Sequence, residues 1–177
     1  QNQFTFALRK NSSYNQQALS GVVASINTWY HVVGTLDSSG NAQIYVNGTA
    51  GTGITSVPTM TNTNDFEIGS FGTTVAILKG KLDQVRIFSK ELSSSEVSTL
   101  YTETVDTVES LDPLNVDTTD TLQVLGDTSC IATYRFENDE TDLSGNYNLT
   151  GTAIQYAAGR YGQAASFNGS SSYAEIT

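Results

Sequence analysis

Residues 29–48 read WYHVVGTLDSSGNAQIYVNG, and this stretch decides the fold class. It contains two runs rich in β-branched and aromatic residues, Trp29–Leu36 and Gln43–Asn47, which are typical of strands. The polar loop Asp37–Asn41 between them has the glycine and asparagine that a hairpin turn uses. The stretch therefore predicts two antiparallel strands, and Asn47-Gly48 predicts a second tight turn after them.

Short strand-like runs recur along the chain, separated by clusters of Gly, Asn and Ser. We expect further strands at Phe4–Leu8, Asp65–Gly69, Gly80–Phe88, Ile131–Glu137, Ala164–Phe167 and Tyr173–Ile176. Strands of this length, with turn residues between them, favour an all-β antiparallel β-sandwich.

One helix is expected within this all-β pattern. Ser93 and Glu96 have the spacing of a capping box, and the residues that follow place an apolar stripe on one face: Val97, Leu100 and Tyr101. The stripe can continue through residues 105–111 to Pro113, which would end it. Because Thr and Val in that extension lower the helix propensity, a short helix followed by an extended acidic linker is the other interpretation.

The charges are unevenly distributed. The chain has 177 residues with 8 basic and 18 acidic side chains, which gives a net charge of −10. Residues 102–129 contain seven acids and no base, so this segment is expected to repel itself and stay extended. So few bases cannot easily form a patch that neutralises phosphates, and we expect no nucleic-acid partner. No apolar run reaches the roughly 18 residues of a membrane-spanning helix, so no membrane insertion is expected.

Cys130 is the single cysteine. It cannot form a disulfide within the chain, so burial and hydrogen bonding must hold the fold together. We expect it to act as a small apolar residue at the start of a strand. An unpaired cysteine suits a protein that folds in a reducing cytosol, such as a bacterial or viral structural protein.

Two groups of segments resemble the concanavalin A-like, laminin G-like family. The first group looks like the closing half of such a module and consists of residues 29–48, 66–69, 80–88 and 90–97. The second group looks like the opening of another module and consists of residues 132–136, 142–146 and 159–169. The resemblance implies an antiparallel jelly-roll β-sandwich with a short helical finish.

The two groups stand in reversed order, with the closing half first. We therefore divide the chain into the C-terminal half of a laminin G-like module (1–103), an acidic linker (104–129) and the N-terminal part of such a module (130–177). Residues 130–177 either begin the next repeat of a longer protein or complete residues 1–103 as a permuted or strand-exchanged partner. A complete module would need a further segment with one or two strands, which neither part supplies.

Residues 120–132 resemble the approach to laminin G-like modules in large structural proteins of tailed bacteriophages, which form fibres or decorate the virion. Modules of this kind also occur in bacterial surface proteins. The resemblance implies a location on a virion surface, or an extracellular or cell-surface location.

A calcium site is implied by the family resemblance, because such sandwiches often hold calcium with Asp and Asn side chains at the loop rim. Calcium needs six to eight oxygen ligands. The best candidates lie in one polar loop together with Asn138 and Glu140: Asp139, Asp142 and Asn146. The alternative is a solvated turn, which we favour because turn chemistry alone accounts for these residue types. The same two alternatives apply to Asp37 and Asn41.

No catalytic or cofactor-binding residues are predicted. The related glucanases place paired carboxylates on one strand in an E-x-D-x-x-E-like arrangement, and this sequence has no such cluster. His31, the single histidine, shares a strand face with Trp29 and Val33 and is expected to pack at a strand edge. The resemblance implies a local structural role for Asp83. We expect a protein without enzymatic activity.

Aromatic side chains are the stronger ligand signal. Five of the tyrosines lie in or near expected loops, where each would either stack on a sugar or straddle core and solvent: Tyr14, Tyr147, Tyr156, Tyr161 and Tyr173.

The functional hypothesis is a non-enzymatic structural and adhesive repeat unit of a virion or cell-surface fibre, whose copies are joined by strand exchange. Its partners would be copies of itself, neighbouring repeats and surface glycans. The alternative is a calcium-dependent carbohydrate-binding module of a larger adhesin or glycan-degrading protein.

Overall fold

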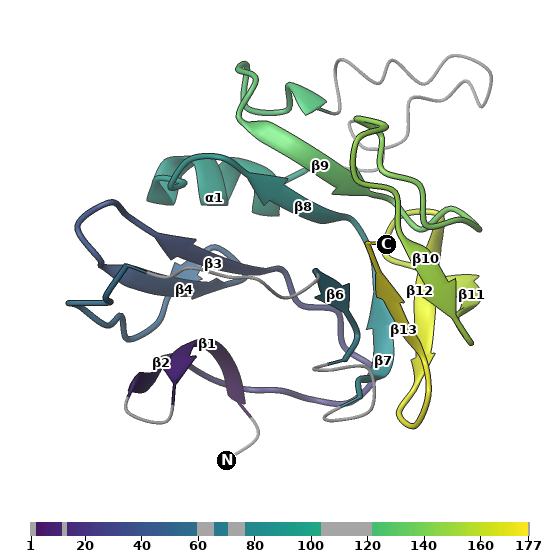
Figure 1. The fold of residues 1–177 in the computed structure, drawn as a ribbon, viewed down its shortest axis with the longest axis horizontal. Coiled ribbons are helices and arrows are strands. Elements are labelled where there is room, and N and C mark those ends of the chain that lie inside the picture. Colours follow the sequence, from purple (N-terminus) through teal and green to yellow (C-terminus); the bar gives the residue numbers. More distant parts are fainter. Residues whose placement is uncertain (1–2, 12–13, 60–65, 71–76, 104–121, 177) are drawn as a thin grey trace. The chain divides into compact units, whose positions relative to one another are not determined.

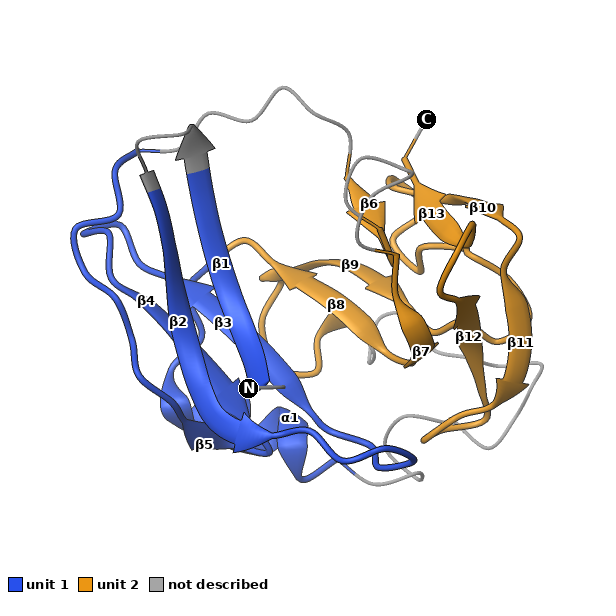
Figure 2. Ribbon diagram, turned by 90° about the horizontal axis from the view of Figure 1, so that it is seen from below, with its two compact units in different colours: residues 1–62, 90–103 blue, residues 63–89, 104–177 orange. Residues whose placement is uncertain are grey.

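The computed structural model describes residues 3–11, 14–59, 66–70, 77–103 and 122–176. Within them it has thirteen strands and one α-helix, and the pairings between strands are antiparallel (Figure 1). The predicted all-β antiparallel class of jelly-roll sandwich, with one short helix, is confirmed. The chain forms two compact units, which are unit 1 (residues 1–62 and 90–103) and unit 2 (residues 63–89 and 104–177) (Figure 2).

Unit 1, in its described part, contains β1 (Gln3–Asn11), β2 (Tyr14–Val23), β3 (Val32–Leu36), β4 (Ala42–Val46), β5 (Thr49–Ala50) and α1 (Ser94–Tyr101). β1 and β2 form a long hairpin, and β3, β4 and β5 form a three-stranded sheet. Two backbone hydrogen bonds of 3.0 and 2.7 Å between Leu19 and Thr52 join the hairpin to the chain that follows β5. Phe6 of β1 lies so close to Gly34 of β3 that an added Cβ would be 2.7 Å from its ring. Only a glycine lets the two strands approach this closely.

The two predicted turns of unit 1 are confirmed. The N–H of Asp37 donates to the carbonyl of Asn41 at 2.9 Å, and the N–H of Gly40 donates back to the carbonyl of Asp37 at 3.2 Å. At the second turn, Asn47 and Gly48 have φ values of 50° and 76°. The turn chemistry therefore sets both ends of β4.

The strand that leads into the hairpin is shorter than predicted. β3 begins at Val32, whereas the sequence predicts a strand from Trp29. Its partner β4 ends at Val46, and the positive φ of Asn47 turns the chain out of the ladder. The residues before β3 therefore have no strand residues of β4 beside them with which they could pair.

The capping box predicted at the helix start is confirmed. The side chain of Ser93 accepts the N–H of Glu96 at 3.3 Å, and the carboxylate of Glu96 accepts the N–H of Ser93 at 2.8 Å. α1 buries two residues of its apolar stripe and ends at Tyr101, as the short-helix interpretation expects. The continuation through residues 105–111 lies outside the described residues.

Ser93→Ala is expected to lower the free energy of unfolding of unit 1 by about 1 kcal/mol, because the N–H of Glu96 loses its acceptor at the helix start. Urea denaturation followed by the fluorescence of Trp29, the single tryptophan, measures the change. Ser98→Ala is the matched control, because Ser98 is exposed in the same helix and its replacement should change stability by less than about 0.5 kcal/mol. Equal losses in the two variants would contradict the capping role.

Unit 2, in its described part, contains β6 (Glu67–Ile68), β7 (Lys79–Leu82), β8 (Val85–Phe88), β9 (Cys130–Tyr134), β10 (Thr150–Thr152), β11 (Gln155–Ala158), β12 (Gln163–Asn168) and β13 (Tyr173–Glu175). These strands form the sheets β10-β13-β6 and β11-β12-β7 and the pair β8-β9. β6, β7 and β8 pair with β13, β12 and β9 respectively. Residues 130–177 thus share sheets with residues 67–88 of the same chain. The division into modules of a longer protein stays a prediction.

The prediction of a single strand at Gly80–Phe88 is wrong. The structure has β7 and β8, which are separated by Asp83 and Gln84. Gln84 has a φ of 52°, and a positive φ breaks the extended path of a strand. The break directs Asp83 toward the loop between β11 and β12, where it accepts hydrogen bonds.

Other strands differ from prediction in extent. The strand predicted at Ile131–Glu137 ends three residues earlier, because Phe136 has a φ of 58°. β6 is shorter than the predicted Asp65–Gly69, whose first residue lies outside the described part. The sequence pattern does not predict β2, β5, β10 or β11. These segments are rich in Gln, Ser, Thr and Gly, and a composition of this kind does not distinguish a strand from a loop. The strands predicted at Phe4–Leu8, Ala164–Phe167 and Tyr173–Ile176 correspond to β1, β12 and β13.

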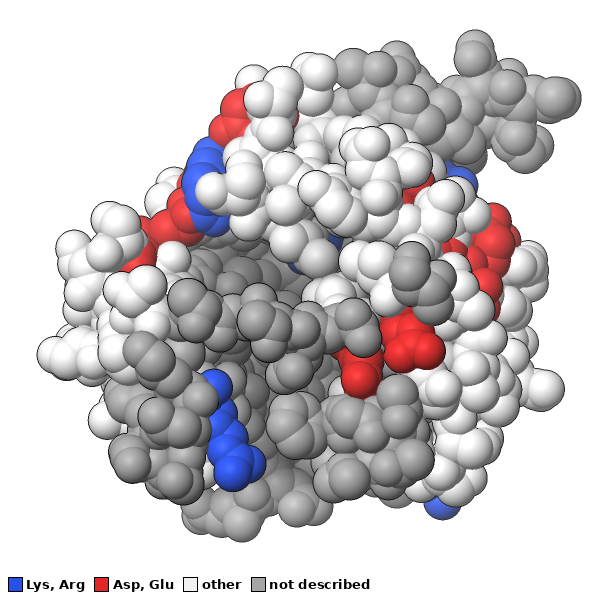
Figure 3. All heavy atoms as spheres, in the orientation of Figure 1, with Lys and Arg blue, Asp and Glu red and all other residues white. Residues whose placement is uncertain are grey.

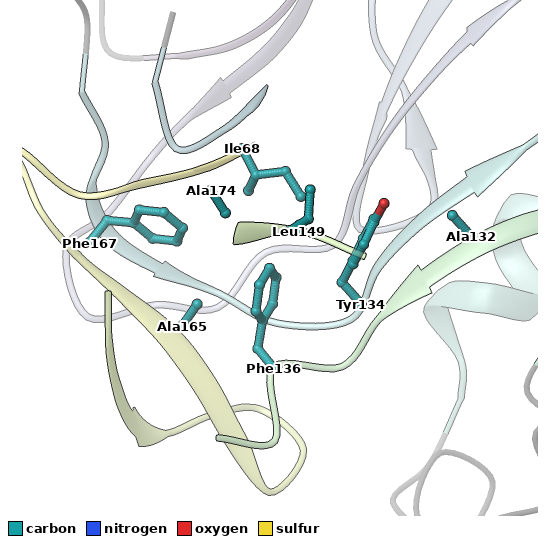
Figure 4. Packing of buried hydrophobic residues seen from close by; sticks show 8 residues of the cluster. All are labelled: Ile68, Ala132, Tyr134, Phe136, Leu149, Ala165, Phe167 and Ala174. Carbon is teal, nitrogen blue, oxygen red and sulfur yellow. The ribbon is translucent and has the colours of Figure 1, made fainter. Parts of the chain in front are cut away.

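The core of unit 2 is a cluster of buried side chains from strands and loops distant in the sequence (Figure 4): Ile68, Ala132, Tyr134, Phe136, Leu149, Ala165, Phe167 and Ala174. Burial of each large member stabilises the fold by about 1.5–3 kcal/mol. Cys130 is buried at the start of β9, as predicted for a small apolar residue. Burial also raises the pKa of its thiol, which disfavours the reactive thiolate.

Candidate functional site

The loop Asn138–Leu149 between β9 and β10 contains every residue of the predicted calcium site. Its middle is attached to β9 by backbone contacts. The N–H of Leu143 donates to the carbonyl of Thr133 at 3.0 Å, and Asp142 forms an isolated β-bridge with Tyr134. The conformation of the loop is therefore set by the strand beside it.

Asp142 anchors this loop and is only 1% exposed. Its Oδ1 accepts the N–H of Thr133 at 2.9 Å and that of Ser144 at 3.1 Å. Its Oδ2 accepts the N–H of Tyr147 at 3.2 Å and the hydroxyl of Ser144. A carboxylate offers about four lone-pair positions, so these four donors use them all. Asp142 therefore ties β9 to both halves of the loop.

In this geometry four hydrogen bonds use the lone pairs of Asp142 that a calcium ion would otherwise occupy. Asp139 and Asn146 are exposed. Asp139 accepts the N–H of Thr141 at 3.0 Å, and Asn146 donates its side-chain amide to Ser144 at 3.3 Å. Among the described residues, no three His, Cys, Asp or Glu side chains are grouped closely enough to hold a metal ion. These contacts fit the turn alternative, and calcium binding by the three residues stays a prediction.

The second calcium candidate, Asp37 with Asn41, lies in the hairpin of unit 1. Asp37 accepts the N–H of Ser39 at 2.8 Å, the N–H of Asn41 at 2.7 Å and the side-chain amide of Asn41 at 2.7 Å. The hydrogen bond from the N–H of Asn41 makes the largest contribution to lowering the pKa of Asp37. The turn alone accounts for both side chains.

Tyr147 is the aromatic residue that the Asn138–Leu149 loop presents to solvent, with 42% of its surface exposed. Its N–H donates to Asp142, and its carbonyl accepts the hydroxyl of buried Tyr134 at 2.8 Å. Burial, together with the charge of Asp142, raises the pKa of Tyr134 to about 12, so this hydroxyl keeps its proton at neutral pH. Asn146 and Asn148, both exposed, flank Tyr147 in the sequence. An aromatic face with amide neighbours can stack on a sugar ring and bond its hydroxyls.

The other tyrosines that the sequence singles out have different positions. Tyr156 lies in β11 and donates its hydroxyl to Glu140, and its pKa is raised first by burial and then by that carboxylate. Tyr14 and Tyr173 begin strands, and the side chain of Tyr14 lies outside the described ones. Tyr161 lies in the loop between β11 and β12. Tyr147 is therefore the tyrosine of this set with the most exposed described side chain.

Two carboxylates of unit 2, Asp83 and Glu137, are close enough to interact electrostatically. Both accept backbone N–H groups of residues 160–163, between the end of β11 and the start of β12. Asp83 accepts those of Arg160 and Tyr161 at 2.7 and 2.8 Å, and Glu137 accepts that of Gln163 at 3.0 and 3.1 Å. These contacts fit the local structural role expected for Asp83. The sequence does not signal the role of Glu137, because a glutamate after a strand resembles any solvated carboxylate.

His31 is half-buried just before β3. Its N–H donates to the side chain of Asn47 at 2.9 Å, and its ring lies 5.9 Å from the ring of Tyr101, measured between centroids. These contacts fit the packing role that the sequence predicts for His31.

Acidic and basic side chains are scattered over the face shown in Figure 3, with broad uncharged areas between them. Among the residues described there, no continuous basic area of the kind that nucleic acid requires is visible. In the part of the chain that the structure covers, no helix is long and apolar enough to cross a membrane.

The chain is similar to known proteins at the level of a family and of a solved structure. No curated protein matches it. The crystal structure of an S-layer domain-containing protein from Clostridium thermocellum is 24% identical, with a TM-score of 0.40, and the match covers 56% of this chain and 52% of that chain. The present chain thus spans about half the length of that solved chain. A laminin G model, described as the concanavalin A-like lectin/glucanases superfamily, matches residues 1–98. The chain therefore belongs to the concanavalin A-like lectin/glucanase superfamily, in its laminin G-like form.

Proposed function

We propose that this chain is a non-enzymatic structural and adhesive domain of a virion or cell-surface protein, and that it holds surface glycans on Tyr147. The observation that carries the proposal is the exposed ring of Tyr147 on a backbone held by Asp142 and Tyr134. Because the backbone is fixed before binding, little conformational entropy is lost when a sugar stacks on the ring. Aromatic side chains with an apolar face suit such contacts.

Membership in a superfamily of lectins and glucanases makes glycans the first ligand class to consider. Binding without hydrolysis is supported by the roles of Asp83 and Glu137, which accept backbone N–H groups of one loop. A retaining glycosidase instead needs two carboxyl groups about 5 Å apart that both reach the glycosidic bond. The proposed contact also needs no cation, because the four hydrogen bonds of Asp142 hold the loop without one.

The structural part of the proposal is supported by the strand pairings of unit 2. β9, β12 and β13 come from residues 130–177 and pair with β8, β7 and β6. If a neighbouring copy supplied the same strands, the two copies would be joined by equivalent hydrogen bonds. Copies of the chain and neighbouring repeats are therefore the protein partners that we propose. The segment of residues 102–129, with seven acids and no base, would act as a spacer between joined copies.

Tyr147→Ala is expected to weaken glycan binding about fivefold or more, because stacking on an aromatic ring contributes about 1 kcal/mol or more. The measurement is an array of neutral and acidic glycans, followed by calorimetric titration of the strongest binder. Tyr147→Phe should keep most of the affinity, because the ring remains. Tyr101→Ala is the matched control, since Tyr101 is 44% exposed but lies in unit 1, and it should bind as the wild type does.

Failure of the folded wild-type chain to bind any glycan, or equal binding by Tyr147→Ala and the wild type, would refute the adhesive role at this loop. Repeating the titration in EDTA separates the calcium-dependent alternative: binding that survives EDTA supports direct stacking, and binding that is abolished overturns it. Light scattering of the wild type tests the structural part. A molecular mass that grows with concentration supports strand exchange, and a monomer at every concentration contradicts it.

A further inference from the structure

The segment of residues 159–163, called the loop below, runs from the end of β11 to Gln163, the first residue of β12, and is held by two carboxylates from other parts of unit 2. Asp83 lies between β7 and β8, and its Oδ2 accepts the N–H of Arg160 at 2.7 Å and that of Tyr161 at 2.8 Å. Glu137 follows β9, and its two oxygens accept the N–H of Gln163 at 3.1 and 3.0 Å. Three of the five backbone N–H groups of the loop therefore point at acidic side chains.

Two glycines make this close approach possible. A Cβ on Gly159 would lie 2.6 Å from Oδ2 of Asp83, and a Cβ on Gly162 would lie 2.5 Å from Oε1 of Glu137. Gly162 also has a φ of 54°, which side chains rarely adopt. The loop sequence is thus shaped to fit around the two carboxylates.

Among the described residues, Oδ1 of Asp83 is buried and has no hydrogen-bond partner. Burial raises the pKa of Asp83 to about 6; the N–H groups of Tyr161 and Arg160 oppose this rise, and the charge of Glu137 adds to it. Keeping the carboxylate of Asp83 ionised at neutral pH therefore costs free energy of folding.

The basic side chains of the elements around Asp83 and Glu137 are Lys79 and Lys81 on β7, Arg86 on β8, Arg135 after β9 and Arg160 in the loop. Lys81 donates to the carbonyl of Ala158 at 2.8 Å. The charge of Arg86 acts on the thiol of Cys130. The guanidinium of Arg160 lies over the ring of Tyr161, 5.4 Å from its centroid.

We propose that Asp83, Glu137 and the loop of residues 159–163 form a pH-sensitive latch, which holds the loop more tightly in mild acid than at neutral pH. Protonation of Asp83 removes its repulsion with Glu137 and the cost of a buried charge, while its carbonyl oxygen still accepts N–H groups. Since the loop carries the exposed Arg160 over Tyr161, the latch controls how rigidly this pair is presented. The inference is independent of the proposed function.

The direction of the pH effect follows from the pKa of Asp83, which is raised from 3.8 to about 6 in the folded chain. A carboxyl group with a raised folded-state pKa binds its proton more tightly when folded. Its stabilising contribution is fully present below about pH 4 and is lost as the pH rises through about 6. The latch is therefore closed most firmly at acidic pH.

Amide hydrogen exchange of the full chain at pH 5.0 and 7.5 tests the latch. After correction for intrinsic exchange, the N–H groups of Arg160 and Tyr161 should be about three- to fivefold better protected at the lower pH. The full pKa shift of Asp83 from 3.8 to about 6 corresponds to about tenfold between these pH values, and the smaller figure allows for the partial exposure of the carboxyl group. In Asp83→Asn, whose amide does not titrate, protection should differ little between the two pH values. Equal pH dependence in the wild type and Asp83→Asn would overturn the proposal.

A second measurement covers the case in which Asp83→Asn does not fold. The carboxyl carbon of Asp83 in the wild type is titrated by NMR, and its midpoint should lie near pH 6. In Glu137→Gln the midpoint should move to lower pH, because one negative charge is removed. A wild-type midpoint near 4, the ordinary value, or an unchanged midpoint in Glu137→Gln would also overturn the latch.

Discussion

Asp142→Ala should lower the free energy of unfolding of unit 2 by about 3–5 kcal/mol, because it removes a buried carboxylate and leaves its donors unpaired. The buried N–H of Thr133, in β9, loses its acceptor, and so do the N–H groups of Ser144 and Tyr147. The loop then separates from the strand that positions it. Urea denaturation followed by circular dichroism measures the loss, and amide exchange shows whether β9 and the loop open first.

Asp139→Ala is the matched control for this prediction. Asp139 is exposed in the same loop and accepts one hydrogen bond, from the N–H of Thr141, so its replacement should cost less than about 0.5 kcal/mol. The two variants also bear on calcium. If calcium stabilises the wild type and both variants lose that stabilisation equally, the metal site predicted for Asp139, Asp142 and Asn146 is supported. If Asp142→Ala is as stable as Asp139→Ala, the anchoring role of Asp142 is refuted.

Gly69→Ala should destabilise unit 2 by about 3 kcal/mol, for two reasons that act together. Gly69 has a φ of 88°, which disfavours any side chain, and a Cβ there would lie 2.2 Å from the ring of Phe167. Phe167 is buried in the core cluster at 3% exposure, so its ring cannot move aside without opening a void. Thermal unfolding followed by circular dichroism measures the effect.

Gly126→Ala separates the two reasons. Gly126 has a similar φ of 75° in the same unit, but a Cβ there would meet nothing within 4 Å. Its replacement should cost about 1 kcal/mol from backbone strain alone. A loss in Gly69→Ala no larger than that in Gly126→Ala would show that Phe167 does not pack where the structure places it.

Local patterns of the sequence predicted the elements whose causes lie within a few residues. The hairpin around Asp37–Asn41 follows from turn chemistry, and the capping box of Ser93 and Glu96 follows from their spacing. The prediction of one strand at Gly80–Phe88 fails because its interruption at Asp83 and Gln84 is stabilised by N–H groups 77 and 78 residues after Asp83. No pattern near Asp83 contains that partner.

The contacts of the candidate site also could not be predicted from local sequence patterns. The residue types of the Asn138–Leu149 loop are compatible with a calcium site or a turn, and the sequence favours the turn because turn chemistry alone accounts for them. The structure places the N–H groups of Thr133 and Tyr147 on Asp142, which accounts for this residue without a metal. The sequence also does not decide whether Tyr147 is exposed, because a tyrosine in a loop can face either core or solvent.

By itself, the amino-acid sequence determined the all-β class, the two turns of unit 1 and the start of the helix, because backbone preferences and near-neighbour hydrogen bonds are local. Only the tertiary structure decided that residues 130–177 share sheets with residues 67–88, that Asp142 is an anchor, and that Asp83 and Glu137 hold one loop. Each of these features depends on backbone N–H groups that come from far along the chain to a carboxylate or a strand edge. Nearly every residue has such an N–H group, so the sequence does not show which one is used. Their partners are therefore specified by the packing of the core and carry no signature of their own in the sequence.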